Sequence, residues 1–511
     1  MKFLNLKTIA LAATIFASGQ VSAETILRYA TISEPPSLDV QMGTASVASL
    51  ISSHMFETLY AFDAKFAPQP LLVVSDKVAD GGKTLILSLR KDVVFHNGQK
   101  MTAKDVAASL TRWGAHGSRG KVLLKTAKSI EVTGEYEVTI KLPEPNGAWR
   151  AMLAFPNGGP VIYPADIVTA AGSTPISKEN YIGTGPYKFN DWRPNRYVEL
   201  VKFDKYAASP MPASGLAGKR EAIIDKLRFM PVPDVGTRTS GVQAGDYDYA
   251  EFIPGDLFDD LSKDSSVKIH LNGAPIFGLM FVNSKVGILK DNFKLRRAIQ
   301  MALNKEEALR VSIGPEKLWS ANGSFYSKGS AWYSEAGTEA FSQADPEGAK
   351  KLAKEAGYDG TPIKLLVSTN YQFHYDQAAV FTKHLAKAGI NVQMVVVDWA
   401  TLLKKRGQPD QWDIFFTHHG TVPDPALITA MNDSYPGWWN TPRKQALKAE
   451  FTGTADINKR IATWNKIQAL IYEEVPAMKT GDVFSYNIAS PKLKGMLEKS
   501  MFWPNFWGVS M

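Results

Sequence analysis

A strand, a helix and a second strand follow one another between residues 363 and 397, and this order constrains the fold more than any other feature of the chain. Ile363 to Ser368 and Val392 to Val397 are short, mostly apolar runs that predict strands. Tyr375 to Ala388, between them, carries its apolar residues on one helical stripe. Two strands joined by a helix pair in parallel through a right-handed crossover. The sequence therefore predicts an α/β fold with a parallel sheet.

Polar and aromatic residues follow the ends of two predicted strands in this region. Trp399 and Arg406 come after the strand Val392 to Val397, and a predicted strand from Trp412 to Thr417 runs into the His418–Asp424 turn. Ligands of parallel sheets bind outside the carboxyl ends of the strands. Trp can form a pocket wall and Arg can hold a carboxylate. We therefore expect a small molecule to bind at these turns.

Residues 1 to 23 have the pattern of a secretory signal peptide. Lys2 and Lys7 lie near the start of the chain and precede the apolar run Thr8 to Ala17. Val21-Ser22-Ala23 then forms a small-x-small cleavage site. The apolar run is far shorter than the ~20 residues of a membrane span. We expect cleavage after Ala23 and an exported, soluble mature chain.

Composition excludes several classes of protein. The chain contains no cysteine, so it has no disulfide framework and no thiolate metal site, and a periplasmic location fits best. The net charge of +8 is spread over 511 residues without basic runs, which argues against nucleic acid as a partner. This length predicts two or three lobes.

Local signals predict several further elements. Leu50, Ile51, Met55 and Leu59 have helical spacing, which predicts a helix from Val47 to Tyr60. A hairpin is expected to turn at Asp80-Gly81-Gly82. Helix starts are expected at Thr102, with Asp105 as its acidic partner, and at Asp345-Pro346.

Several motifs occur in a fixed order along the chain and together resemble one protein family. They are FETLYAFDAKFAPQPLL (56–72), GTGPYKF (183–189), GDYD (245–248), FKLRRAI (293–299), Trp412-Asp413-Ile414 and Asp424-Pro425. This series is similar to the family 5 extracellular solute-binding proteins of ABC importers, which include binders of oligopeptides, dipeptides and nickel. Taken alone, the GTGPY glycines and His96 are interpreted as structural turn residues.

The resemblance implies a two-lobed periplasmic-binding-protein fold of the class II type, cluster C, with an extra inserted subdomain. Lobe one is expected at 24–63, 181–265 and 480–511, the insertion at 64–180, and lobe two at 266–479. Two segments would then cross between the main lobes and act as a hinge. Such proteins capture a solute in the cleft and deliver it to an ABC permease and ATPase complex in the inner membrane. The family implies that the binding protein itself catalyses no hydrolysis. We also expect a monomer with no enzymatic activity, no cofactor and no metal ion held by protein ligands.

Ten positions are candidates for ligand contact, mostly because they match cleft positions of the family. They are Glu34, Glu251, Phe252, Phe277, Trp399, Arg406, His418, His419, Thr421 and Asp424. Trp399 and Arg406 keep the Trp-then-Arg spacing of the oligopeptide binders.

One departure from the family concerns the ligand's amine. Peptide binders place an aspartate shortly before the Asp-Pro pair, but here that position falls on Thr421 or Val422, which carry no charge. A buried ammonium without a partner costs several kcal/mol. Either His418, His419 or Glu251 replaces the aspartate, or the ligand lacks a free amine. The ligand is therefore left open among a peptide, an opine, a sugar, haem and a metal chelate.

Two other classes of function remain as alternatives. One is a binding protein that presents its ligand to a sensor or chemoreceptor. The other is a periplasmic enzyme on the same scaffold, although the chain has no Gly-x-Ser-x-Gly, His-Glu-x-x-His or Gly-x-Gly-x-x-Gly motif. His418 and His419 are adjacent, and neighbouring strand residues point to opposite faces, which argues against a shared metal ion.

Overall fold

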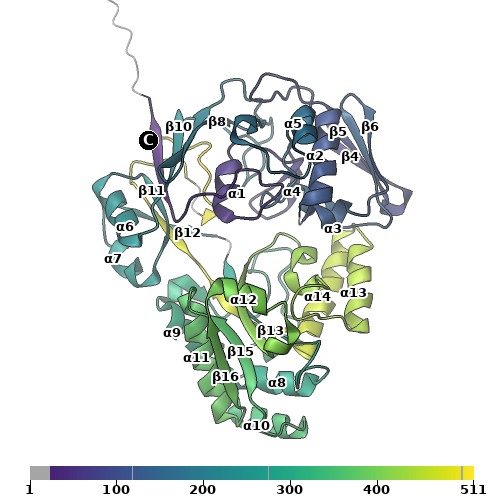
Figure 1. The fold of residues 1–511 in the computed structure, drawn as a ribbon, viewed down its shortest axis with the longest axis vertical. Coiled ribbons are helices and arrows are strands. Elements are labelled where there is room, and N and C mark those ends of the chain that lie inside the picture. Colours follow the sequence, from purple (N-terminus) through teal and green to yellow (C-terminus); the bar gives the residue numbers. More distant parts are fainter. Residues whose placement is uncertain (1–23, 118, 274, 497–498) are drawn as a thin grey trace, which may run out of the picture.

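The computed structural model describes residues 24–117, 119–273, 275–496 and 499–511, and the predicted signal peptide lies outside this range. The chain forms two lobes (Figure 1). Segments from the start and the end of the chain lie together in the upper lobe, whereas the lower lobe is built from later residues (Figure 1).

An eight-stranded mixed sheet forms the centre of the first lobe. Its strands come from three separate parts of the chain, and β1 lies between β11 and β10 and is parallel to both. In sheet order the strands are β20 (Lys499–Ser500), β12 (Lys268–Asn272), β19 (Tyr486–Ala489), β11 (Tyr249–Ile253), β1 (Ile26–Thr31), β10 (Lys226–Pro231), β9 (Tyr197–Lys202) and β8 (Tyr187–Arg193). Its helices are α1 (Ser46–Ser52), α6 (Val235–Ala244) and α7 (Phe258–Leu261).

A four-stranded antiparallel sheet lies within the segment expected as an insertion. Its order is β4 (Val73–Ala79), β5 (Thr84–Leu89), β7 (Glu137–Lys141) and β6 (Ser129–Gly134), and β2 (Tyr60–Phe62) pairs separately with β3 (Pro68–Pro70). The helices are α2 (Ala103–His116), α3 (Gly120–Leu124), α4 (Trp149–Ala154) and α5 (Ala165–Ala171). The predicted hairpin turn and the Thr102–Asp105 capping box are both confirmed.

A six-stranded sheet forms the second lobe. In sheet order its strands are β14 (Trp319–Ser320), β18 (Ala477–Val483), β13 (Ile276–Val282), β17 (Ile414–Gly420), β15 (Ile363–Ser368) and β16 (Val392–Val397). The helices are α8 (Phe293–Ala302), α9 (Lys305–Ile313), α10 (Pro346–Glu355), α11 (Gln372–Lys387), α12 (Trp399–Lys405), α13 (Pro442–Thr452) and α14 (Ile457–Glu474). The predicted crossover is confirmed, because β15 and β16 have the predicted bounds, are parallel, and are joined by α11.

Two segments carry the chain between the lobes, one from β12 to β13 and one from β18 to β19. Both lie a few residues later than the expected boundaries at 265 and 480. The reason is backbone pairing, since β12 pairs with β19 in the first sheet while β18 pairs with β13 in the second.

The helix expected from Val47 to Tyr60 was predicted too long, and it ends at Ser52. The Met55 carbonyl accepts a hydrogen bond from the backbone N–H of Gly185, 2.8 Å away, so this segment pairs with the GTGPY turn instead of continuing as a helix. A Cβ atom at Gly183 or Gly185 would collide with the Met55 carbonyl. The structural interpretation of these glycines therefore stands.

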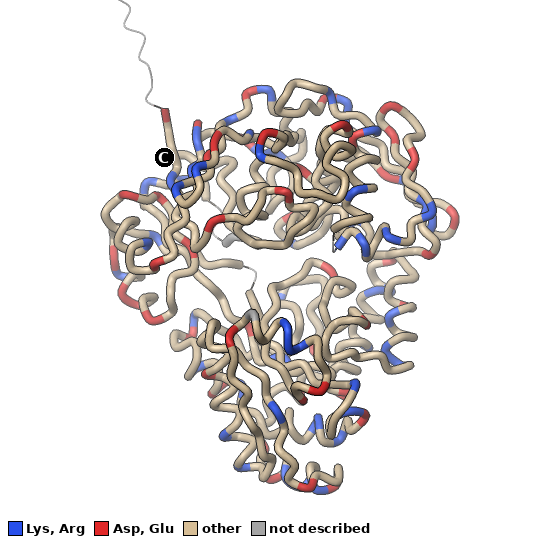
Figure 2. The backbone as a smooth tube through the Cα atoms, in the orientation of Figure 1, with Lys and Arg blue, Asp and Glu red and all other residues tan. Residues whose placement is uncertain are grey.

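Charged residues of both signs are interspersed over the two lobes (Figure 2). In the part of the chain that the structure describes, no helix has both the length and the hydrophobicity needed to cross a membrane.

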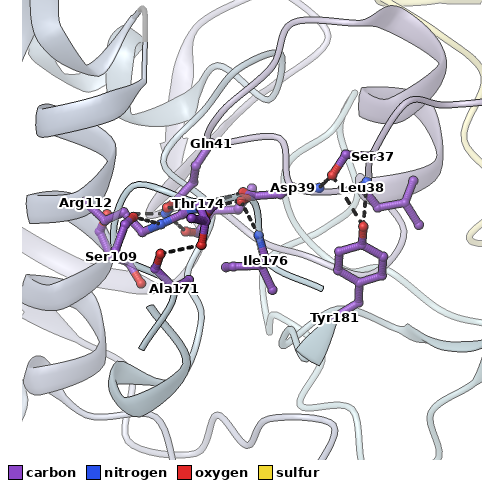
Figure 3. A network of polar contacts seen from close by, with 12 residues as sticks. Ser37, Leu38, Asp39, Gln41, Ser109, Arg112, Ala171, Thr174, Ile176 and Tyr181 are labelled. Carbon is purple, nitrogen blue, oxygen red and sulfur yellow. Dashed lines mark hydrogen bonds and ion pairs between the residues drawn. The ribbon is translucent and has the colours of Figure 1, made fainter. Parts of the chain in front are cut away.

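A buried ion pair joins the insertion to the first lobe (Figure 3). Arg112 on α2 donates to both carboxylate oxygens of Asp39, at 3.3 and 2.7 Å, and to Oε1 of Gln41 at 2.8 Å. Its remaining donors bond the carbonyl oxygens of Gly172 and Thr174. All five guanidinium N–H groups thus donate hydrogen bonds. These bonds offset the free-energy cost of removing the ion pair from water.

We predict that Arg112→Met lowers the free energy of unfolding by roughly 3–5 kcal/mol, because it leaves the Asp39 carboxylate buried without its partner. Urea denaturation of the purified mature protein measures the change. Arg310→Met is the matched control, since Arg310 forms an exposed pair with Glu306 that contributes less than about 0.5 kcal/mol. Equal effects of the two substitutions would contradict an anchoring role for Arg112.

Candidate ligand-binding site

A cavity of about 800 Å³ lies between the two lobes, within the usual range for small-molecule sites. Its walls come from β11 and from the turn after α2 on one side, and from β13, the end of β17 and the start of α11 on the other. Six of the ten candidate residues line it: Glu251, Phe252, Phe277, His418, His419 and Thr421. The other four, Glu34, Trp399, Arg406 and Asp424, do not.

Glu251 on β11 is the acidic residue among the described residues that line this cavity. Its side chain accepts hydrogen bonds from the Tyr29 hydroxyl (3.0 Å) and from the backbone N–H of Ile32 (2.9 Å). Burial raises its pKa above the ordinary value for a glutamate. These two bonds fix the carboxylate and leave its remaining lone pairs for a ligand.

Arg119, which sequence reasoning missed, supplies positive charge to the cavity wall. Its guanidinium lies 4.4 Å from the centre of the Phe155 ring and donates to Oδ1 of Asn157 at 3.2 Å. Nε is buried without a hydrogen-bond partner, and no carboxylate of the described residues pairs with the group. Burial lowers its pKa to about 10, so it stays protonated at neutral pH. An anionic group of a ligand would satisfy it.

His418 and His419 lie in strand β17, which corrects the predicted turn, because the strand continues to Gly420 through its pairing with β13. The two rings therefore find their hydrogen-bond partners on opposite faces of the strand, because successive strand residues point to opposite faces. Nδ1 of His418 lies 3.0 Å from Nε2 of His374, whereas Nδ1 of His419 lies 3.0 Å from the Thr429 hydroxyl. No group of three or more metal-ligating side chains is found in the described ranges.

Burial keeps both cavity histidines uncharged. It lowers the pKa of His418 to about 4. It also lowers the pKa of His419 to about 3, with smaller contributions from His418, Arg406 and Arg119. Neutral imidazoles bind through hydrogen bonds and ring contacts and cannot replace an aspartate as the partner of an ammonium. Glu251 is the remaining candidate for that task among the three considered.

Aromatic side chains cover much of the cavity wall. Phe277 on β13 is almost fully buried, while Phe252 is 44% exposed and has a left-handed backbone, with φ of 51°. Such a conformation is costly for a bulky residue and concentrates at ligand sites. Tyr371 and Phe373, at the start of α11, also line the cavity. They follow the carboxyl end of β15, so the rule that pointed to Trp399 could have found them.

Arg406 and Trp399 lie behind the cavity wall. Arg406 donates to the Tyr435 hydroxyl at 3.0 Å, and its guanidinium also lies 5.3 Å from the centre of that ring. The expected carboxylate clamp therefore does not reach the cavity. Trp399 stacks on His418, with ring centres 6.0 Å apart and planes inclined by 22°. Trp399 therefore packs against the cavity residue His418 and does not itself line the cavity.

Glu34 and Asp424 are used in structural contacts. Glu34 accepts from Trp192 Nε1 at 2.7 Å and from the backbone of Asn195. Asp424 forms a buried pair with Arg460 at 2.7 and 2.8 Å. Thr421 lines the cavity and also donates from Oγ1 to the carbonyl of Pro275, in the segment that crosses between the lobes.

Two lobes joined by two crossing segments, with a polar and aromatic cavity between them, define a solute-binding protein of the bilobal class. The family "Bacterial extracellular solute-binding proteins, family 5 Middle" matches residues 67–440. The chain belongs to this family, as its motifs indicated. The predicted fold class and the general function, capture of a small solute in the cleft, are confirmed.

Individual relatives agree with this assignment. The chain is 28% identical over 488 residues to the probable peptide ABC transporter periplasmic-binding protein y4tO of Sinorhizobium fredii, covering 91% of this chain and 90% of that one. It shares its fold with the binding protein AgaA of A. tumefaciens R10, solved with agropinic acid, at 22% identity and a TM-score of 0.76, over 95% and 98% of the two chains. It also shares the fold of a Pseudoalteromonas sp. SM9913 dipeptide-binding protein, solved with Met-Leu, at 18% identity and a TM-score of 0.75, over 95% and 99%.

We predict that the imidazoles of His418 and His419 stay neutral from pH 8 down to about pH 5. NMR of histidine-labelled protein over this pH range measures their protonation. An unfolded chain takes up these protons near pH 6.5, whereas the folded chain does so only near pH 4 and 3. The unfolded state thus binds more protons in this window, so the histidines' contribution to folding stability is lost as pH falls below 6.5. Titration near pH 6.5 would contradict the buried setting.

Proposed function

We propose that this protein is the periplasmic binding component of an ABC importer for a peptide-like solute that carries both a carboxylate and an amine. The observation that carries the proposal is the pairing of charges in the cavity. Arg119 supplies the guanidinium and Glu251 the carboxyl group among the described residues that line it. Glu251 is buried, whereas Arg119 is partly exposed with a buried Nε, and among the described residues neither has an ionic partner of opposite sign within salt-bridge distance.

Desolvated charges of this kind are weakly compensated in the empty protein. A ligand carboxylate beside Arg119 and a ligand ammonium beside Glu251 would each gain a charge-assisted hydrogen bond. A dipeptide or short peptide offers both groups, and the aromatic residues Phe252, Phe277 and Tyr371 suit its apolar side chains. The description of the Sinorhizobium relative as a peptide transporter component supports this choice of ligand.

The bound ligand would hold the lobes together. Arg119 and Glu251 belong to the upper part of the molecule, whereas His418, His419 and Phe277 belong to the six-stranded sheet below. A solute that touches both walls stabilises the closed arrangement by its differential contacts. The closed form is then recognised by the membrane permease. The protein binds without chemical change, works as a monomer, and reaches the periplasm through the signal peptide cleaved after Ala23.

The first test concerns the carboxylate. Calorimetric titration of a panel of di- to pentapeptides should identify peptides that bind, and amidation of the carboxyl terminus should weaken them. Arg119→Met should weaken binding of the free acid by roughly ten- to a hundredfold, the range for hydrogen bonds to charged groups. Arg406→Met is the matched control and should change affinity less than about twofold, because Arg406 is bonded to Tyr435. A larger effect at Arg406 than at Arg119 would reverse these assignments.

The second test concerns the amine. Acetylation of the amino terminus should weaken binding to the wild-type protein, whereas Glu251→Gln should bind the free and acetylated forms with similar affinity. Because burial raises the pKa of Glu251, binding of the free amine should also weaken on acidification, at a higher pH than an ordinary glutamate would give, and Glu251→Gln should lose this dependence. Equal discrimination by both proteins would place the amine elsewhere, and failure of every peptide in the panel would refute the peptide assignment.

A further inference from the structure

His374 and His418 form a hydrogen bond between two imidazoles at the cavity wall. His374, on α11, is fully buried and does not line the cavity, whereas His418 does. Nε2 of His374 lies 3.0 Å from Nδ1 of His418. One of these nitrogens must carry the proton and the other must accept it. The choice decides whether the free nitrogen of His418, Nε2, donates or accepts toward a ligand.

The surroundings of His374 favour one of the two arrangements. Its Nδ1 is buried and has no hydrogen-bond partner among the described residues. If Nδ1 carried the proton, a buried N–H donor would be left unsatisfied, and such donors are rarer in proteins than unsatisfied acceptors. If Nε2 carries it, Nδ1 is left as a bare lone pair and Nε2 donates to His418. The neutral imidazole also prefers the Nε2–H form intrinsically.

Packing holds the His418 ring in the orientation that this bond requires. Trp399 stacks on one side of it, and the Tyr371 ring meets it at 66°, with centres 4.6 Å apart. Tyr371 also contacts His374, with ring centres 5.1 Å apart. The imidazole therefore cannot turn freely to exchange its two nitrogens. Nε2 of His418 has no hydrogen-bond partner within the described part of the chain, which leaves it for a ligand.

We propose that His374 is a positioning residue that fixes His418 as a hydrogen-bond donor through Nε2, so that this wall of the cavity selects a ligand oxygen. The oxygen belongs to a carbonyl or carboxylate, and a ligand N–H at the same place is disfavoured because two donors would face each other. The inference rests on the proposed function only for the presence of a ligand in the cavity. The proton position itself is a property of the empty protein.

The test is therefore made without ligand. The chain has eight histidines, few enough to assign in ¹⁵N-labelled, deuterated protein by substituting them one at a time. The expected result at pH 7 is an N–H···N scalar coupling between His374 Nε2 and His418 Nδ1, with the proton on His374 and a second proton on Nε2 of His418. A proton on Nδ1 of His418, or the absence of coupling, would overturn the proposal.

Two variants separate positioning from packing. His374→Phe keeps an aromatic ring but removes both nitrogens, so the coupling should vanish and His418 should become a mixture of tautomers. His384→Gln is the matched control, because His384 lies on the same helix but bonds Glu307 and the backbone of Asn304, away from the cavity. It should leave the His418 signals unchanged. A His418 tautomer unaltered by His374→Phe would assign its orientation to Trp399 and Tyr371 alone.

These results do not depend on the identity of the ligand. If the peptide panel fails while the coupling and the tautomer are found, the donor at His418 stands and the ligand class is revised. If peptides bind while the proton is found on Nδ1 of His418, the proposed function stands and the role of His374 is rejected.

Discussion

The pair formed by Arg112 and Asp39 is the contact on which the position of the cavity wall depends. Of the five hydrogen bonds from this guanidinium, three tie α2, in the insertion, to Asp39 and Gln41 of the first lobe, and two bond carbonyl oxygens within the insertion. Such a pair is costly to break, since a single buried charge would remain. The turn after α2 carries Arg119, so the same anchor fixes the position of the cation in the cavity. A structural ion pair thus supports a cavity-lining arginine seven residues further along the chain.

Arg112 and Arg119 differ in how many of their guanidinium donors are hydrogen-bonded within the protein. Arg112 has every donor bonded, whereas Arg119 has a single side-chain acceptor, Asn157, and a buried Nε without a partner. The first is complete within the fold. We propose that a ligand completes the second, and that Glu251 takes a ligand group of the opposite sign. Neutral His418 and His419 add hydrogen-bonding groups without adding charge, so the proposed ligand carries one anionic and one cationic group.

Local structure could be predicted well from the sequence, and long-range contacts could not. The bounds of β15 and β16 followed from apolar runs, and the capping box at Thr102 from two residues three positions apart. The helix after Val47 was predicted too long because its end depends on pairing with Gly185, which is far away in the sequence. Periodicity carries no information about such a partner.

The same limit applies to the site. His418, Phe277 and Glu251 could be placed at the cavity from strand ends and family motifs. Arg406 was expected there as well, but the Tyr435 hydroxyl takes its guanidinium, and no pattern near residue 406 reveals this. Arg119 was missed for the converse reason, because a lone arginine in a glycine-flanked turn has no distinguishing sequence signal.

The most direct test of the account is native mass spectrometry of the protein purified gently from the periplasm, followed by denaturing release and identification of the molecule that accompanies it. The account predicts a solute with at least one carboxylate and one free amine, such as a short peptide. A sugar, or any other solute that lacks both groups, would contradict the assignment of Arg119 and Glu251 as its two charge partners.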